Sequence, residues 1–341
     1  MTTAALRWAL VGASDIAANR VLPAIRAVGG DAVVVRSGDA AHGRAYADRH
    51  QIADAVTDLA AAVDRADVDA VYVSSVNQLH HDQVVAAAAA GKHVLAEKPL
   101  ALSVADARAM VAACRAAGVV MATNHHLPAN PVHRAIKQAV ADGRVGEVRA
   151  VRVHHAVQLP PRLAGWRVKD PEGGGVVLDV TVHDAAAVAA ILGTHAVSVT
   201  ATGANQDNDP GGPYDAVMTT IAWDGDIVVQ THDAYNNAHL PTSLHLLGTD
   251  GALVGEDCNT GDPVGSLTLW RGTTAQPLDV GPREDLYVAT LRAFEAAVRG
   301  EGEVLVSGED GVASLAVSMA VLEALRTGAR AQVEQVEQVA R

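Results

Sequence analysis

Three ionisable side chains stand in contexts that suit acid–base chemistry. Lys98 lies in the segment Glu97-Lys98-Pro99, directly after the apolar run 93–96, and the chain has only four lysines. We expect this run to be a central parallel strand, and open α/β sheets bind ligands at the carboxyl ends of such strands. The alternative is a lysine that merely begins a surface turn.

The glycine-rich segment 173–184 supplies the other two, Asp179 and His183. They are four residues apart in an expected helix, so both side chains project from one face. A carboxylate beside an imidazole orients the ring and favours its protonated form, which is one way to build a general acid. The alternative is an aspartate that favours the helix dipole and a histidine satisfied in the core.

A nucleotide-binding turn is indicated near the start of the chain. The text Leu-Val-Gly-Ala-Ser-Asp-Ile-Ala occupies 10–17, after the first apolar run and before a helical pattern. Gly12 permits a tight turn, Ser14 is small enough for a pyrophosphate to approach the backbone, and Ala17 permits close helix packing. Because Ser14 replaces the second glycine of the fingerprint, an ordinary strand-to-helix turn is the alternative.

The end of the second apolar run bears on the choice of cofactor. An acidic residue there takes the ribose 2′-hydroxyl of NAD, whereas a hydroxyl or an arginine accommodates the 2′-phosphate of NADP. Ser37 favours the phosphate, and Asp39, two residues on, could repel it. The residues by themselves leave this choice open.

The elements that must position these groups follow two patterns. Up to residue 123, Val-rich runs at 8–11, 32–36, 70–74, 93–96 and 119–123 alternate with Ala-rich helical stretches such as 16–27, 78–90 and 104–117. This alternation predicts a doubly wound parallel sheet, a Rossmann domain over residues 1–123.

A second domain is expected over residues 124–341. Helices fit 131–142, 177–192, 286–299 and 311–327, a strand fits 147–157, and a proline-containing loop fits 158–174. Successive strands with turn signals fit 196–270. Strands that follow one another without helices predict an α/β domain with a large, mostly antiparallel open sheet.

Composition limits the partners. The chain has 341 residues, 49% hydrophobic and 19% charged, with 26 Lys plus Arg against 39 Asp plus Glu and a formal net charge of −13. That charge disfavours nucleic acid or an anionic membrane as main partner. No membrane-length apolar run or signal-peptide pattern occurs, and two cysteines form no disulfide framework, so we expect a soluble cytoplasmic protein.

Taken together, the motifs resemble the glucose–fructose oxidoreductase/inositol dehydrogenase (Gfo/Idh/MocA) family over almost the whole chain. The motifs are 12–17, Asn77-Gln78-Leu79-His80, Glu97-Lys98-Pro99 and the Asp179/His183 pair; the text around 124–127, 159–167 and 179–185 is similar to keto-sugar reductases of that family. The resemblance implies a cis bond before Pro99 and a C-terminal sheet that often forms dimer contacts, so a homo-oligomer through that sheet is one option.

The resemblance also implies roles for individual residues. Those expected to bind the cofactor are Gly12, Ala13, Ser14, Ile16, Ala17, Ser37, Gly38, His42, Ser75, Val76, Asn77, His80, Glu97, Lys98, Asn124, Trp166, Arg167 and Tyr287. Those expected to bind substrate are Lys98, Trp166, Asp179 and His183. From the residues themselves, His155 or His154 is a further candidate, because alternate residues of the expected strand face the same side. The catalytic residues would be Lys98, Asp179 and His183. His42 replaces an arginine of the similar reductases, and Gly38-Asp39 replace small hydroxyl residues, which weakens the argument for NADP.

The function implied is NADP(H)-dependent reduction of a keto-sugar. Hydride from nicotinamide C4 would attack the carbonyl carbon, His183 would donate the proton with Asp179 orienting it, and Lys98 would stabilise the charge on oxygen. NAD(H) is not excluded. One alternative is an NAD-dependent sugar or inositol dehydrogenase acting on a polyol; another is a nucleotide-sensing protein without turnover.

Two histidine pairs, at 125–126 and 154–155, raise the question of a metal. Neither the HExxH spacing nor a cysteine-rich segment accompanies them, so we predict neutral imidazoles near a sugar pocket or on a strand, and no metal. Cys114, Trp8 and Trp223 are expected to be packing residues.

Overall fold

The computed structural model describes residues 5–336. The chain forms two compact units, which we describe separately. The first comprises Met1–His125 and Tyr287–Gly311, and the second comprises His126–Leu286 and Val312–Arg341. The segment Tyr287–Gly311 therefore packs with the first unit, whereas the division expected from the sequence at residue 123 placed it in the second domain.

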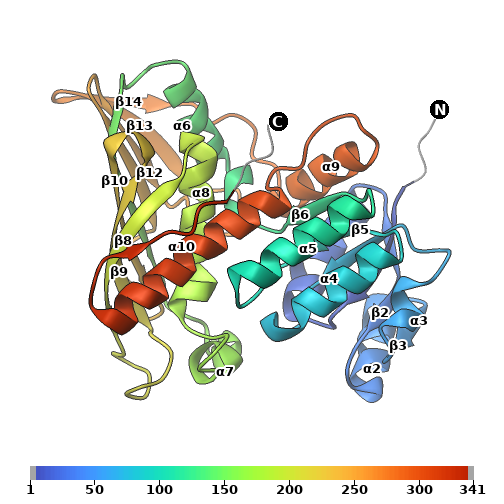
Figure 1. Cartoon of the computed structure of the whole chain (residues 1–341). Helices are drawn as coiled ribbons and strands as arrows, with labels where there is room; N and C mark the ends of the chain where they lie inside the picture. Colours follow the sequence, from blue (N-terminus) through green and yellow to red (C-terminus); the bar gives the residue numbers. More distant parts are fainter. Residues whose placement is uncertain (1–4, 337–341) are drawn as a thin grey trace. The chain divides into compact units, whose positions relative to one another are not determined.

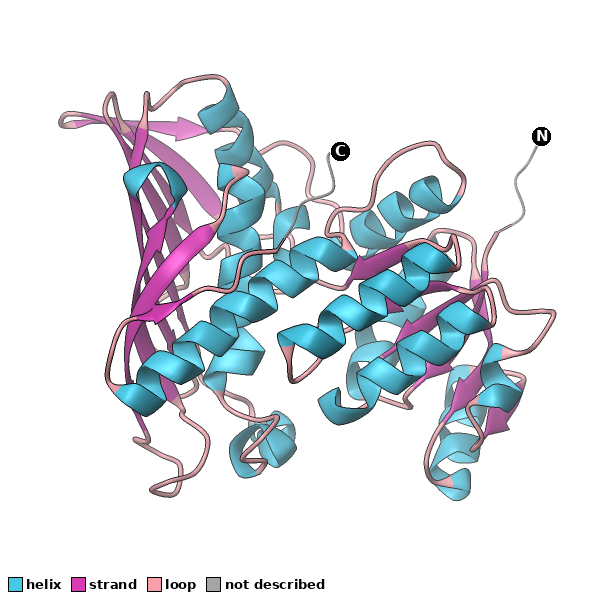
Figure 2. Cartoon of the chain, viewed as in Figure 1, coloured by secondary structure: helices cyan, strands magenta, loops and turns pink. Residues whose placement is uncertain are grey.

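The first unit is built on a parallel six-stranded sheet (Figures 1 and 2). Its order, β3-β2-β1-β4-β5-β6, is that of a dinucleotide-binding Rossmann sheet, and this confirms the expected fold. The strands are β1 (Arg7–Val11), β2 (Asp31–Arg36), β3 (Asp54–Val56), β4 (Ala70–Val73), β5 (His93–Ala96) and β6 (Met121–Thr123).

Helices connect these strands and cover the sheet. They are η1 (Ala17–Val21), α1 (Leu22–Ala27), α2 (Ala40–His50), α3 (Ala60–Val63), η2 (Asn77–Leu79), α4 (His80–Ala89), α5 (Val104–Ala116) and α9 (Leu286–Val298). The sequence shows why α5 begins where it does: the Ser103 hydroxyl accepts a hydrogen bond from the backbone N–H of Asp106, the usual N-cap arrangement.

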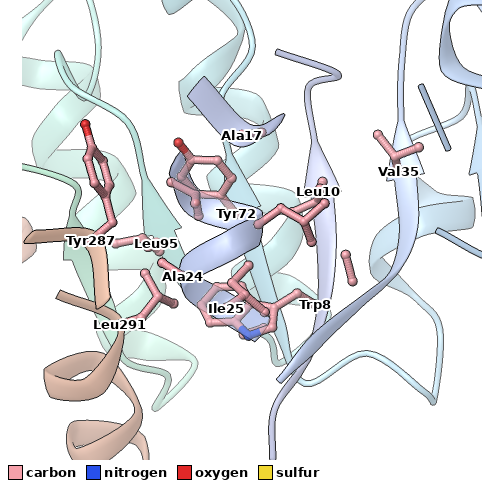
Figure 3. Packing of buried hydrophobic residues seen from close by; sticks show 14 of the residues in the cluster. Trp8, Leu10, Ala17, Ala24, Ile25, Val35, Tyr72, Leu95, Tyr287 and Leu291 are labelled. Atoms are coloured by element: carbon pink, nitrogen blue, oxygen red, sulfur yellow. The ribbon is translucent and has the colours of Figure 1, made fainter. Parts of the chain in front are cut away.

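The core of this unit explains why the distant segment α9 belongs to it. Trp8 of β1 is fully buried, and its ring packs on that of Phe294 at a centroid distance of 5.3 Å. Figure 3 shows Leu291 of α9 in the same cluster as Leu95 of β5. Burying one such large apolar side chain contributes about 1.5–3 kcal/mol. The expected packing role of Trp8 is confirmed.

The second unit contains a nine-stranded sheet of order β14-β13-β12-β11-β7-β10-β9-β8-β15. The β7–β10 pair is parallel and the other neighbours are antiparallel, so the expected mostly antiparallel sheet is confirmed. The strands are β7 (Val148–Ala156), β8 (Ala196–Ala204), β9 (Ala216–Trp223), β10 (Ile227–Ala234), β11 (Ser243–Gly248), β12 (Ala252–Glu256), β13 (Ser266–Arg271), β14 (Thr274–Leu278) and β15 (Ala331–Gln332).

The helices of this unit are η3 (Leu127–Ala129), α6 (Pro131–Ala141), α7 (Pro161–Lys169), η4 (Val177–Thr181), α8 (Val182–Leu192), η5 (Asp224–Asp226) and most of α10 (Gly308–Thr327). α6 and α8 pack on one face of the sheet (Figure 1). Along β7, Val151, Val153 and His155 are buried because alternate residues of a strand face the same side. His155 is thereby directed toward the helical layer.

The expectation of a loop over 158–174 was wrong for its central part. Pro161 occupies the first turn of α7, where its missing N–H and its restricted φ favour a helix. Gly165 interrupts the helix with φ 17° and ψ −121°. The prolines and glycines that suggested a loop therefore start and bend a short helix.

Between residues 5 and 336, no helix combines the length and the apolar character that crossing a membrane requires.

Candidate active site

The first group of candidate residues lies where β1 leads into η1. Gly12 has φ +119°, and a Cβ on it would come within 2.7 Å of the Ser74 backbone. Ser14 Oγ donates to Ser74 Oγ at 2.8 Å and accepts from the Ala17 N–H at 3.2 Å. The Ser14–Ser74 hydrogen bond thus links the turn 12–17 to the end of β4. At Gly12 the backbone lies so close to Ser74 that a side chain would not fit. These features fit the phosphates of a dinucleotide.

We expect Gly12→Ala to weaken dinucleotide binding by at least tenfold and to destabilise the protein by about 1–3 kcal/mol, because alanine would be strained at this φ and its Cβ would collide with the Ser74 backbone. Fluorescence titration with NADPH and urea unfolding would measure both. Gly91→Ala is the matched control: Gly91 also has a positive φ, +70°, but its Cβ would point into open space. Equal effects of the two substitutions would contradict the close-approach argument.

At the end of β2, hydrogen bonds connect Ser37, Asp39 and His42, the residues that bear on the choice between NAD and NADP. The buried Ser37 accepts the Asp39 N–H at its Oγ (3.2 Å). Asp39 is the N-cap of α2, and its Oδ1 accepts the His42 N–H at 2.7 Å. The His42 ring reaches back to the Ala13 carbonyl oxygen at 3.2 Å. The negative charge of the Asp39 carboxylate is therefore stabilised by its place at the start of α2, where the helix dipole favours an anion.

The segment after β4 is joined to the residues around Pro99. His80 is fully buried, with Nδ1 3.0 Å from the Pro99 carbonyl oxygen and Nε2 3.1 Å from that of Ser75. Burial lowers the pKa of His80 and outweighs these two carbonyls. The Lys98–Pro99 bond is cis, as expected. Within 75–80, Asn77 is buried and Val76 is half exposed.

Glu97 anchors the end of β5, just before Lys98. Its Oε1 accepts hydrogen bonds from the Tyr72 hydroxyl and from Asn124 Nδ2, each at 2.5 Å. Burial raises the pKa of Glu97 and, more strongly, that of Tyr72. Lys98 itself is half-buried. The backbone on which Lys98 stands is therefore held by three neighbouring strand ends.

Tyr287, expected in the pocket, is 4% exposed and belongs to the hydrophobic cluster of the first unit. The Arg20 guanidinium lies 5.9 Å from the centroid of its ring.

In the second unit, Asp179 is held by two donors from other elements. Its Oδ2 accepts from Arg167 Nε of α7 and from the Tyr235 hydroxyl, both at 2.9 Å. Burial and the Asp179 charge raise the pKa of Tyr235 well above its ordinary value. The Arg167 guanidinium also lies 4.7 Å from the ring centroid of Trp166. The structure thus joins Trp166, Arg167 and Asp179 in one cluster.

The relation between Asp179 and His183 differs from the regular helix that we expected. Residues 177–181 form a π-helical turn, and the α-helix begins at Val182. The four-residue spacing therefore crosses a junction between two helical geometries, so the one-face argument does not apply directly. The role of Asp179 in orienting His183 stays a prediction.

His183 is 7% exposed and lies edge-on to the ring of His126, with centroids 4.8 Å apart. The next residue, Asp184, has its Oδ1 2.7 Å from Nδ1 of His155. His155 and Asp184 therefore form a histidine–carboxylate pair that sequence reasoning missed. Two signals pointed to it: Asp184 directly follows His183, and the alternation of β7 turns His155 inward.

Among residues 5–336, no three His, Cys, Asp or Glu side chains are grouped as metal ligands would be. Cys114 is buried, as expected of a packing residue, and burial raises its pKa to about 12. Trp223 is 3% exposed, which confirms its packing role.

Family models match both units. The model described as "Oxidoreductase family, NAD-binding Rossmann fold" matches residues 6–125, and the "GFO/IDH/MocA C-terminal domain" matches residues 133–254.

Individual proteins are similar over nearly the full chain. The 1,5-anhydro-D-fructose reductase of Ensifer adhaerens is 45% identical over 329 residues, 96% of this chain and 98% of that protein. Among solved structures, the aldose-aldose oxidoreductase of Caulobacter crescentus superimposes with a TM-score of 0.86 at 24% identity, covering 96% of this chain and 99% of the other. The 3-ketoreductase KijD10 of Actinomadura kijaniata, in complex with NADP and TDP-benzene, gives 0.82 at 25% identity, covering 94% and 97%.

Proposed function

The chain belongs to the Gfo/Idh/MocA oxidoreductase family, and from this premise we propose that it is an NADP(H)-dependent reductase that converts 1,5-anhydro-D-fructose to 1,5-anhydro-D-mannitol. One observation carries the proposal: the 45% identity to the reductase of Ensifer adhaerens extends over 96% of this chain. Identity at that level and extent supports a shared substrate class as well as a shared fold.

The cofactor would be held by the Rossmann unit. When bound, it supplies a hydride from C4 of its nicotinamide. The turn 12–17 would bind the pyrophosphate, and residues 75–80 with Glu97 and Asn124 would line the nicotinamide half. NADP(H) is favoured by three observations: the Ser37 hydroxyl at the end of β2, the use of the Asp39 carboxylate as a helix cap, and the NADP in the KijD10 structure.

The acid–base work is assigned to Lys98, Asp179 and His183. His183 would donate a proton to the carbonyl oxygen of the substrate, and Lys98 would stabilise the negative charge that develops there. Arg167 and Tyr235 hold Asp179 rigidly, so its carboxylate is preorganised. Trp166, 37% exposed and stacked on Arg167, would offer an apolar surface to the sugar, and His155 a polar contact.

The test is the absorbance of reduced nicotinamide while the purified protein meets 1,5-anhydro-D-fructose, with NADPH and NADH in parallel. We expect NADPH to be oxidised at least tenfold faster than NADH at equal concentrations, because a 2′-phosphate bound near Ser37 adds favourable contacts. Faster use of NADH would reverse the cofactor assignment and keep the reaction. No oxidation of either, with reduction of NAD⁺ or NADP⁺ by polyols, would replace this function with that of a sugar or inositol dehydrogenase. Cofactor binding without any turnover would indicate a sensing protein.

A further inference from the structure

Two carboxyl groups meet inside the second unit, next to the histidine pair described above. Asp184 of α8 is 1% exposed and Asp233 of β10 is 0% exposed, and their carboxyl groups interact directly. A carboxylate has only acceptor atoms, so two carboxyl groups can hydrogen-bond only if one of them carries a proton. A hydrogen bond between these two groups would therefore require one of them to be a protonated acid.

The other contacts of the pair show which oxygens are engaged elsewhere. Asp184 Oδ1 faces His155 Nδ1 at 2.7 Å. Asp233 Oδ2 accepts from the hydroxyls of Thr181, at 2.5 Å, and Thr231, at 3.1 Å. The two remaining carboxyl oxygens are Asp184 Oδ2 and Asp233 Oδ1. Each is buried and accepts no hydrogen bond from a donor among the described residues. A single proton between these two oxygens satisfies both.

The fold brings these groups together from three elements. Asp233 stands opposite His155 in the parallel pairing of β10 with β7, and α8 packs on that face of the sheet. A chain of hydrogen bonds runs from Thr219 through Thr231 to Asp233, and from Asp184 to His155. Because Nδ1 of His155 is committed to Asp184, any further hydrogen bond of this ring must use Nε2.

We propose that Asp184 and Asp233 hold one proton between them, and that this acid pair positions His155 so that its Nε2 addresses a hydroxyl group of the sugar. The second half rests on the proposed function. Asp184 and Asp233 are positioning residues, since they act through His155.

The electrostatics of the surroundings agree with a single shared proton. Burial raises the pKa of Asp184 to about 7, and burial together with the Asp184 charge raises that of Asp233 well above its ordinary value. Two carboxylates in contact inside a protein cannot both ionise near neutral pH. We place the proton on Asp233, because Asp184 has the ring of His155 as a partner for its charge.

The other titratable groups near Asp184 and Asp233 do not remove the need for a proton between these two carboxyl groups. His183 precedes Asp184 on α8. Cys258, after β12, has its pKa raised to about 12 by burial, so it is neutral. His133 of α6, which faces His155, has its pKa lowered to about 4 by burial and is neutral as well. His154 precedes His155 on β7, and burial lowers its pKa too.

The first test follows stability against pH. An unfolded aspartate releases its proton near pH 4, whereas Asp233, whose pKa is raised well above its ordinary value, keeps its proton in the folded protein. The stabilisation from this proton is complete below about pH 4 and is lost progressively as the pH rises from there toward the raised pKa of Asp233. In Asp233→Asn the amide donates to Asp184 without a titrating proton. We therefore expect the Tm of the variant, relative to the wild type, to rise by several degrees between pH 5 and pH 8.

Asp224→Asn is the control for this comparison, since Asp224 is exposed and accepts the His195 N–H near the surface. Its Tm difference from the wild type should stay constant with pH. A difference that is equally constant for Asp233→Asn would overturn the shared proton. This measurement of Tm against pH needs no substrate, so it tests the shared proton even if the proposed function is wrong.

The second test asks which acid holds the proton. We expect Asp233→Asn to leave the NMR titration of His155 unchanged, because Asp184 stays charged beside it. Asp184→Asn removes that charge, so the pKa of His155 should fall and KM for the sugar should rise about tenfold, with a smaller change in kcat. Equal shifts in both variants would refute the assignment of the proton to Asp233. An altered titration with an unchanged KM would refute the contact between His155 and the sugar.

Discussion

Replacing His183 by alanine is expected to lower kcat by about 10²–10⁴-fold, the range typical of losing a general acid. The buried imidazole is assigned as the proton donor to the substrate carbonyl. The residues assigned to the pyrophosphate, 12–17, lie in the other unit, so NADPH affinity should be unchanged. Stopped-flow turnover and NADPH titration would measure the two quantities separately.

The pH profile distinguishes this role from a structural one. In the reductive direction a general acid must be protonated, so kcat of the wild type should fall as the pH rises through the pKa of the donor. The variant should lose this dependence. His232→Ala is the matched control, because it also removes an imidazole that packs on another one, His154, at 5.0 Å between centroids. Near-full turnover of His183→Ala would remove His183 from the mechanism.

Replacing Lys98 by methionine is expected to lower kcat by about 10²–10³-fold. This is the range typical of losing one preorganised group that stabilises a developing oxyanion. Methionine retains most of the volume and removes the charge. Glu97, Tyr72 and Asn124 hold the backbone at this point, so the substitution should leave the fold intact. Circular dichroism and kcat of the two proteins would test both statements.

Lys92→Met is the matched control, since Lys92 and Lys98 flank opposite ends of β5. Lys92 Nζ donates to the carbonyl oxygens of Arg65 and Val68, at 2.8 and 2.9 Å. We expect this variant to lose stability and keep kcat, because ligands of such sheets bind at the carboxyl end of the strands. If Lys98→Met also kept kcat, the charge at this position would have no part in catalysis.

Much of the fold follows from local sequence patterns. Continuous apolar runs separated by helical stretches specify a parallel sheet covered on both faces, and the six-stranded sheet bears this out. The turn at Gly12 was expected from a short local motif, and the cis bond before Pro99 from the family resemblance. The helix α7 was missed, because the prolines that punctuate loops also begin helices.

The acid pair shows what the sequence alone determined and what it left to the tertiary structure. The period-two pattern of β7 determines that His154 and His155 face opposite sides of the sheet, so that one of them points inward. Only the tertiary structure brings Asp233, 49 residues further along the chain, beside Asp184, through the parallel pairing of β7 with β10. Likewise, Tyr235 meets Asp179 only because of that sheet order. Periodicity reports which face of its own element a residue occupies, whereas the partner on that face depends on the topology and register of elements distant in sequence.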